Sequence, residues 1–201
     1  MSQAETQGPR TPRGERTAAR LRDAARAVFA DHGYASARVE DIVARAGVSH
    51  GTFYTYYDNR AAILDDLVDE AAERLRAVVD QPWEGPDVAA AIRSVIAAFV
   101  DTLSDEGDVI GAWIEASSTD EHFRTRLRDV RSSYTDQVAR HLAPALAHTP
   151  HDPVVAAGAL VAMVEGYTTD RLAAGGSAER EAAVNTLAQL WFGGLIRLSQ
   201  A

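Results

Sequence analysis

Hydroxyl-bearing and basic side chains gather between Val39 and Arg60, and this stretch offers the clearest chemistry in the chain. Serine, threonine and tyrosine hydroxyls and arginine guanidinium groups are usual donors to DNA phosphate oxygens. Ala46-Gly47-Val48 has the small residues of a tight turn between two short helices, as in a helix-turn-helix motif. Ser49 is a favoured N-cap for the second helix, whose N–H groups and positive dipole end suit a phosphate. The stretch therefore predicts a DNA-reading helix-turn-helix.

Helical periodicity runs through almost the whole chain, and no segment alternates convincingly like a β-strand. A first helix is expected from about Glu15 to Gly33, and a long fourth helix follows a cap at Asp58 or Asn59. Two prolines and a glycine within residues 81–86 indicate a boundary. We therefore expect an all-α fold with two domains. Residues 1–80 form a three-helix helix-turn-helix domain with a disordered arm (1–14) and a connecting helix, and residues 81–201 form a larger helical domain.

Charge is distributed unevenly along the 201 residues. Residues 1–64 contain nine Arg and seven acidic residues, a net charge of +2, whereas the remainder contains 11 Arg and 22 acidic residues, a net charge of −11. A mildly basic head on an acidic body is compatible with nucleic-acid binding, although the exclusive use of arginine also fits a GC-rich genome. The absence of cysteine and of a long apolar run favours a cytoplasmic protein without a membrane span.

Residues 33–64, GYASARVEDIVARAGVSHGTFYTYYDNRAAIL, resemble the N-terminal domain of the tetracycline-repressor (TetR) family. The matching positions are Gly33, Tyr34, Val39, Asp41, Ile42, Ala46, Gly47, Val48, Ser49, Gly51, Thr52, Phe53, Tyr54, Tyr56, Tyr57, Arg60 and Leu64. The remainder resembles the family only in its helical plan and length. The resemblance implies a transcriptional repressor that binds double-stranded DNA at a palindromic operator and is released by a small-molecule effector.

The resemblance implies that Phe53 and Tyr57 lie in the core and that Tyr54 and Tyr56 contact DNA. The alternative is that Tyr54, Tyr56 and Tyr57 all pack in the core of a small helical domain. Ala37-Arg38 replaces a threonine pair, so we expect either a cap from Ser36 or a phosphate contact from Arg38. His50 stands where lysine is common, which predicts pH-sensitive binding near neutrality. The predicted DNA contacts are Arg38, Ser49, His50, Gly51, Thr52, Tyr54, Thr55, Tyr56 and Arg60.

Two C-terminal helices, within residues 154–172 and 183–198, are too apolar for one side of each to face water. They form either a buried helix pair or, as the resemblance implies, a homodimer interface that matches a palindromic operator by symmetry. The predicted interface residues are Val161, Val184, Leu187, Trp191, Gly194 and Leu195. An effector pocket is expected between the middle helices. Its predicted residues are Phe99, Trp113, Glu115, Tyr134, Met163, Tyr167 and Arg171.

The six histidines lack the spacing of metal ligands, so we predict no metal and no cofactor. Two other functions remain. One is a small helical enzyme, which requires carboxylates brought together only by the fold. The other is a helical ligand-binding or adaptor protein whose DNA-binding head has lost its function. A DNA affinity that falls steeply with salt and favours one palindrome distinguishes an operator-binding protein from both.

Overall fold

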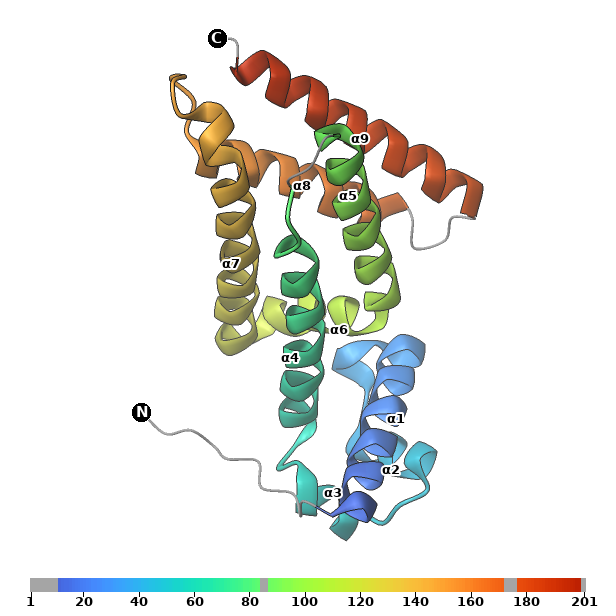
Figure 1. The fold of residues 1–201 in the computed structure, drawn as a ribbon. Coiled ribbons are helices and arrows are strands. Elements are labelled where there is room, and N and C mark those ends of the chain that lie inside the picture. The colour runs from blue at the N-terminus through green and yellow to red at the C-terminus, as the bar shows by residue number, and fades with distance from the viewer. Residues whose placement is uncertain (1–10, 84–86, 172–176, 200–201) are drawn as a thin grey trace. The chain divides into compact units, whose positions relative to one another are not determined.

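The computed structural model describes residues 11–83, 87–171 and 177–199, with the backbone alone at residues 170–171 and 177–178. Over these ranges the chain forms helices and no strand (Figure 1), which confirms the all-α prediction. The helices are α1 (Pro12–Ser36), α2 (Val39–Ala46), α3 (His50–Tyr56), α4 (Arg60–Val79), α5 (Val88–Asp105), α6 (Gly107–Thr119), α7 (Glu121–Leu146), α8 (Pro153–Arg171) and α9 (Ser177–Ser199).

Contacts between residues divide the chain into two compact units. Unit 1 comprises Met1–Ala71 and Asp108–Leu127, and unit 2 comprises Ala72–Gly107 and Arg128–Ala201. The helices α4 and α7 therefore contribute residues to both units, and α6 belongs to unit 1 although it follows α5 in the chain. The functional division at residue 80 stays a prediction; the contact units differ from it because residues 108–127 pack with the N-terminal helices.

Helix α1 carries the apolar stripe that the sequence predicts. It begins at Pro12, a residue favoured in the first turn, and Thr11 caps it by accepting a hydrogen bond from the Gly14 N–H at 3.1 Å. Residues 12–14 are therefore helical, which corrects the expected extent of the arm, and residues 1–10 lie outside the described residues. The buried stripe consists of Leu21, Ala24, Ala25, Val28 and Phe29.

Gly33 interrupts α1 with a kink rather than ending it. Its φ of 70° and ψ of 164° are not helical, and helical structure resumes as far as Ser36. A β-carbon at Gly33 would lie 2.9 Å from Glu115 Oε2 on α6. The positive φ favours glycine at this position, and a β-carbon here would also displace the Glu115 carboxylate.

In unit 2, α5 packs against both α8 and α9 (Figure 1). Helix α8 begins at Pro153 as predicted, and the Asp152 carboxylate accepts a hydrogen bond from the Val154 N–H at 2.8 Å. Within the described ranges, no helix combines the length and the apolar character needed to cross a membrane. The buried side chains of α5 are Ile92, Val95, Ile96, Phe99 and Val100.

Candidate nucleic-acid interface

Helices α2 and α3 join at Gly47 to form the predicted helix-turn-helix. Gly47 has a φ of 62° and a ψ of 42°, the left-handed region that glycine enters without steric cost. Its N–H donates to the Ala44 carbonyl at 3.2 Å and closes the end of α2. Arg20 on α1 donates to the carbonyls of Ala46 and Gly47, so α1 braces the turn. The turn at Gly47 is thus confirmed, and Arg20 joins the residues that hold it.

The N-terminus of α2 is capped from within the helix. Arg38 is the N-cap residue, and its backbone N–H donates to Asp41 Oδ2 at 3.1 Å, which is one half of a capping box. Ser36 does not serve as this cap because it still belongs to α1. The Arg38 side chain is exposed and has no ion-pair partner within the described residues. It is therefore available to a phosphate.

Helix α3 has a buried and an exposed face. Phe53 is fully buried, and Tyr57, which follows the helix, is 4% exposed. The Tyr57 hydroxyl donates to Asp66 Oδ2 at 2.6 Å. Burial, and then the bond and charge of Asp66, raise the pKa of Tyr57 well above its ordinary value, so the hydroxyl stays protonated. These two residues belong to the core of unit 1. The exposed face carries His50, Gly51, Tyr54 and Thr55.

The hydroxyl groups of α3 differ in their availability to a ligand. Ser49 Oγ accepts a hydrogen bond from the Thr52 N–H at 3.1 Å, which confirms Ser49 as the N-cap, and it lies 2.9 Å from Thr52 Oγ1. The Thr55 hydroxyl donates to the carbonyl one turn earlier at 2.9 Å. Tyr54 is 55% exposed and Tyr56 is half-buried, and neither hydroxyl has a partner in the described part of the chain. Among the described residues, the hydroxyls of Tyr54 and Tyr56 are therefore available to donate to a ligand.

His50 and Gly51 form the exposed first turn of α3. A β-carbon at Gly51 would meet only Ser49 Oγ, at 3.8 Å, so packing within unit 1 does not require glycine. His50 Nε2 lies 3.8 Å from Glu40 Oε1 on α2, and both side chains are exposed. Neither residue contributes to the core, so both are available for contact with a binding partner.

Residues 47–51, GVSHG, also fit the Gly-x-Ser-x-Gly spacing of a hydrolase nucleophile elbow. Such an elbow places its serine at a sharp turn from a strand into a helix. Here the segment joins two helices, and Ser49 Oγ accepts a hydrogen bond from the Thr52 backbone. The local geometry is therefore that of a helix cap.

Arg60, a predicted DNA contact, is engaged inside unit 1. Its Nη1 donates to the carbonyls of Tyr34 at 2.6 Å, Ala35 at 3.1 Å and Ala37 at 2.5 Å. Its guanidinium carbon lies 4.2 Å from the centre of the Tyr34 ring. These carbonyls follow the kink at Gly33, so Arg60 ties the start of α4 to the end of α1. Its contact with DNA stays a prediction.

Replacing Arg60 with Met should lower the free energy of unfolding by about 1–2 kcal/mol, because three carbonyls lose a charged donor. Arg60→Lys should recover only part of this loss, since an ammonium lacks the planar fork of a guanidinium. Denaturant unfolding followed by circular dichroism measures both variants. A midpoint for Arg60→Met equal to that of the wild type would show that these carbonyls find other partners.

Two predicted effector residues lie in unit 1 instead of lining a cavity of unit 2. Glu115 on α6 accepts hydrogen bonds from the backbone N–H groups of Tyr34, at 2.6 Å, and Ala35, at 3.2 Å. Trp113 is buried, and its indole N–H donates to the Phe123 carbonyl at 3.1 Å. Glu115 therefore binds N–H groups at the end of α1, where Arg60 binds carbonyls, and Trp113 belongs to the core.

Phe99 and Tyr134, also predicted for the effector pocket, lie beside a small internal cavity of unit 2. Phe99 borders this cavity, and Tyr134 packs edge-to-face against Phe99 with ring centroids 5.6 Å apart. The Tyr134 hydroxyl donates to the buried carboxylate of Glu165, and Arg131 Nη2 lies 2.9 Å from the other oxygen of that carboxylate. The cavity, of about 20 Å³, is lined by Val79, Trp83, Val95, Ile96, Phe99, Val138, Val161, Val164 and Trp191.

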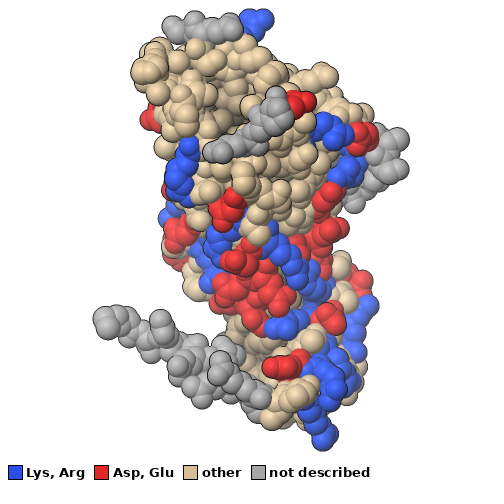
Figure 2. Space-filling view, viewed as in Figure 1, with Lys and Arg blue, Asp and Glu red and all other residues tan. Residues whose placement is uncertain are grey.

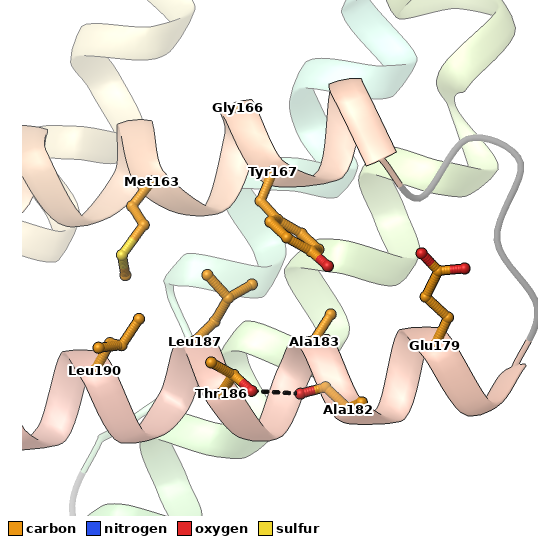
Figure 3. A pocket seen from close by; sticks show the side chains of 9 residues that line it. All are labelled: Met163, Gly166, Tyr167, Glu179, Ala182, Ala183, Thr186, Leu187 and Leu190. Atoms are coloured by element: carbon orange, nitrogen blue, oxygen red, sulfur yellow. Dashed lines mark hydrogen bonds between the residues drawn. The ribbon is translucent and has the colours of Figure 1, made fainter.

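Met163 and Tyr167 line a groove of about 550 Å³ between α8 and α9. Figure 3 shows Met163 and Tyr167 on α8 pointing toward Leu187 and Leu190 on α9. Tyr167 is 39% exposed and Leu190 is 56% exposed, so apolar side chains reach solvent here. The side chain of Arg171, the last predicted effector residue, lies outside the described residues. The groove is lined by Met163, Gly166, Tyr167, Glu179, Ala182, Ala183, Thr186, Leu187 and Leu190.

The residues predicted at a dimer interface lie mainly inside unit 2. Gly194 and Leu195 are half-buried. Four others are at most 4% exposed: Val161, Val184, Leu187 and Trp191. They pack within their own subunit, as expected if the two C-terminal helices form a buried helix pair. The exposed large apolar residues of α8 and α9 are Val154, Val155, Tyr167, Leu190 and Ile196. The apolar surface is therefore offset from the predicted set.

Arginines and acidic side chains lie next to one another on the face seen in Figure 2. In unit 1, Arg22 pairs with Asp66 at 3.3 Å, and Arg45 pairs with Asp31. Internal partners thus neutralise part of the positive charge of the N-terminal residues. The number of arginines in this segment is therefore larger than the number of positive charges available to DNA.

These features define a helix-turn-helix protein: α3 is anchored by its apolar face, Gly47 makes a left-handed turn, and α1 braces that turn. Residues 21–67 match the sequence model of the family described as "Bacterial regulatory proteins, tetR family". This segment of the chain is therefore similar to the N-terminal domain of that family.

Relatives with assigned functions match about half of the chain. The transcriptional repressor LfrR of Mycolicibacterium smegmatis is 37% identical over 89 residues, which is 43% of this chain and 46% of LfrR. The repressor DhaR of Mycobacterium sp. strain GP1 is 29% identical over 103 residues, 50% of this chain and 52% of DhaR. The matched part of the chain thus spans about half the length of these relatives.

The likeness to solved structures extends over most of the chain. The fatty acid degradation regulator FadR of Bacillus halodurans superimposes with a TM-score of 0.74 and 22% sequence identity. The superposition covers 89% of this chain and 96% of that protein, and it shows that the two share a fold.

Proposed function

We propose that the protein is a transcriptional repressor that binds a palindromic operator as a homodimer and leaves it when a small molecule binds unit 2. The observation that carries this proposal is the two-faced helix α3. Phe53 holds one face in the core, while His50, Tyr54 and Thr55 lie on the exposed face. A major groove admits one α-helix, and the N-terminal residues of such a helix contact base edges.

The occupant that we propose for the groove between α8 and α9 is a second copy of the chain. A palindromic operator requires a two-fold symmetric protein whose recognition helices lie about 34–36 Å apart. Pairing of two identical faces would remove the exposed side chains of Tyr167 and Leu190 from water. The apolar lining of the groove, from Met163 to Leu190, supports this assignment.

Coupling between effector and DNA would use α6. An effector acts only through different affinities for two conformations of the protein. Helix α6 follows α5 directly in the chain, and Phe99 on α5 borders the cavity of unit 2. Glu115 on α6 holds the backbone of Tyr34 and Ala35 at the end of α1. A displacement of α6 would therefore disturb the helix that braces the turn between α2 and α3.

Selection of bound sequences from random double-stranded DNA tests the proposal. We expect one palindrome to be enriched, and its affinity to fall steeply with salt because phosphate contacts release counterions. Scrambled DNA of equal length and composition serves as the control. A protein that enriches no sequence would be a ligand-binding or adaptor protein, and the repressor function would be rejected.

A protein with both Tyr54→Phe and Tyr56→Phe should bind DNA about three- to tenfold more weakly, by a similar factor for every sequence, because two phosphate donors are lost. Tyr57→Phe is the matched control: it removes a hydroxyl that bonds Asp66 within the core, so it should lower stability but not the DNA affinity of the folded protein. Band-shift titrations measure the affinities. Wild-type affinity in the double variant would remove both tyrosines from the interface.

A further inference from the structure

Trp83 borders the small cavity of unit 2 and holds an unused hydrogen-bond donor. Its side chain is 8% exposed, and its indole Nε1 is buried without a hydrogen-bond partner among the described residues. A buried donor without a partner costs free energy that a bound acceptor would recover. An unpaired donor beside a cavity therefore favours a ligand with an acceptor.

The other two tryptophans of the chain have acceptors supplied by the fold. Trp113 donates to the Phe123 carbonyl at 3.1 Å, and Trp191 donates to the Leu160 carbonyl at 3.2 Å. Trp83 and Trp191 border the same cavity with ring centroids 5.7 Å apart, yet only Trp191 is paired. The unpaired N–H is therefore particular to the position of Trp83.

Stacking fixes the Trp83 ring. Trp83 and His141 lie with ring centroids 4.8 Å apart and planes inclined by 5°. His141 Nε2 lies 3.2 Å from the Val79 carbonyl oxygen, which accepts the imidazole N–H in that contact. Reorientation of the indole would break the stack, so the donor is held where it is.

The remaining lining of the cavity is apolar and uncharged. Aliphatic side chains, Phe99 and Trp191 surround the space beside Trp83. A charged ligand would lose its hydration here without receiving a counter-charge, whereas a neutral apolar molecule would gain from burial. The site therefore selects a neutral ligand.

The size of the cavity bears on regulation. Its volume of about 20 Å³ holds about one water molecule, so a larger ligand enters only if the lining side chains move apart. Such a ligand binds the widened conformation better than the closed one. A difference in affinity of this kind is what shifts a conformational equilibrium.

We infer that this cavity takes an uncharged apolar molecule with one strong acceptor, such as a ketone or ester oxygen, that receives the Trp83 N–H. This molecule is the effector of the protein, an assignment that rests on the proposed repressor function. Binding by itself does not depend on that function.

Two series of probes test the inference: n-alkyl phenyl ketones and n-alkylbenzenes matched in carbon number. Calorimetric titration of the full chain should give a ketone that binds about three- to tenfold more tightly than its matched hydrocarbon, the ratio expected for one added hydrogen bond. Trp83→Phe keeps an aromatic ring beside His141 and should abolish the preference. Trp113→Phe, which removes an N–H paired with the Phe123 carbonyl and does not border the cavity, should keep it. Circular dichroism confirms that each variant is folded.

Three results would overturn the ligand class: no binding by either series, equal binding of ketone and hydrocarbon, or a preference that survives in Trp83→Phe. The first of these would leave the cavity to water. If the ketone that binds most tightly releases the protein from the selected operator, the effector role is supported. If that ketone binds with the expected preference but the protein stays on the DNA, the effector role is rejected. Failure of the repressor function has a different signature, because no operator would be selected while the binding preference persisted.

Discussion

A Leu190→Glu variant should be monomeric and should bind the operator about a hundredfold or more weakly than the wild type, because the second half-site no longer adds to binding. Leu190 is 56% exposed, so the new carboxylate can be hydrated in a single subunit and the fold should persist. In a two-fold dimer the same patch of each subunit meets its partner, and two carboxylates would be buried without counter-charges. The substitution therefore acts on association rather than on the core.

Light scattering during size-exclusion chromatography measures the mass of this variant, and band shifts with the selected operator measure its affinity. Ile114→Glu is the matched control, since Ile114 on α6 is 44% exposed and does not line the groove. It adds the same charge and should remain dimeric. If Leu190→Glu keeps the dimeric mass, the subunits associate through another face.

Local features of the fold were predictable because their physical causes lie within a few residues. Gly47 has the left-handed conformation that its place in the turn predicts, and the Ser49 side chain caps α3. Asn59 accepts the Ala62 N–H at 3.0 Å, which selects it over Asp58 as the cap of α4. Caps and turns depend on the conformational preferences of single residues, and these are fixed by side-chain chemistry.

Contacts between distant segments were not predictable in this way. Arg20, Arg60 and Glu115 bind backbone groups of other helices, and nothing in their neighbouring sequence names those groups. Long-range partners depend on how helices pack, and helical periodicity says only which face is apolar. Every residue also has a backbone carbonyl, so an acceptor of this kind cannot be recognised from residue types, whereas an acidic partner of an arginine can.

The proposed dimer face illustrates a second limit of periodicity. Helix α8 is apolar almost all round, so its sequence does not say which stripe faces its own subunit and which faces outward. Val161 was assigned to the interface but is 4% exposed, whereas Tyr167, six residues later, is 39% exposed. The helix could be recognised from sequence, but its rotation about its own axis depends on packing against α5 and α9.

The Arg131→Met variant should lose about 1–3 kcal/mol of stability near neutral pH, because it removes the counter-charge of a buried carboxylate. Glu165 is 8% exposed. Its carboxylate accepts a hydrogen bond from the Tyr134 hydroxyl and forms an ion pair with Arg131. Breaking a fully buried ion pair costs about 3–5 kcal/mol. The Arg131 side chain is 57% exposed, so solvent screens part of its charge and the expected loss is smaller.

The loss should grow as the pH rises. Burial raises the pKa of Glu165 above its ordinary value, and the charge and hydrogen bond of Arg131 offset part of that rise. A carboxyl group with a higher pKa in the folded state binds its proton more tightly there, so stability falls as pH rises from the ordinary pKa through the raised one. Without Arg131 the pKa rises further, and the decline extends to higher pH. Denaturant unfolding across this range measures the gap between variant and wild type. In a Glu165→Gln background, Arg131→Met should lower the free energy of unfolding by less, and this loss should depend little on pH. If the loss in the single variant stays constant with pH, Arg131 acts through packing rather than through its charge.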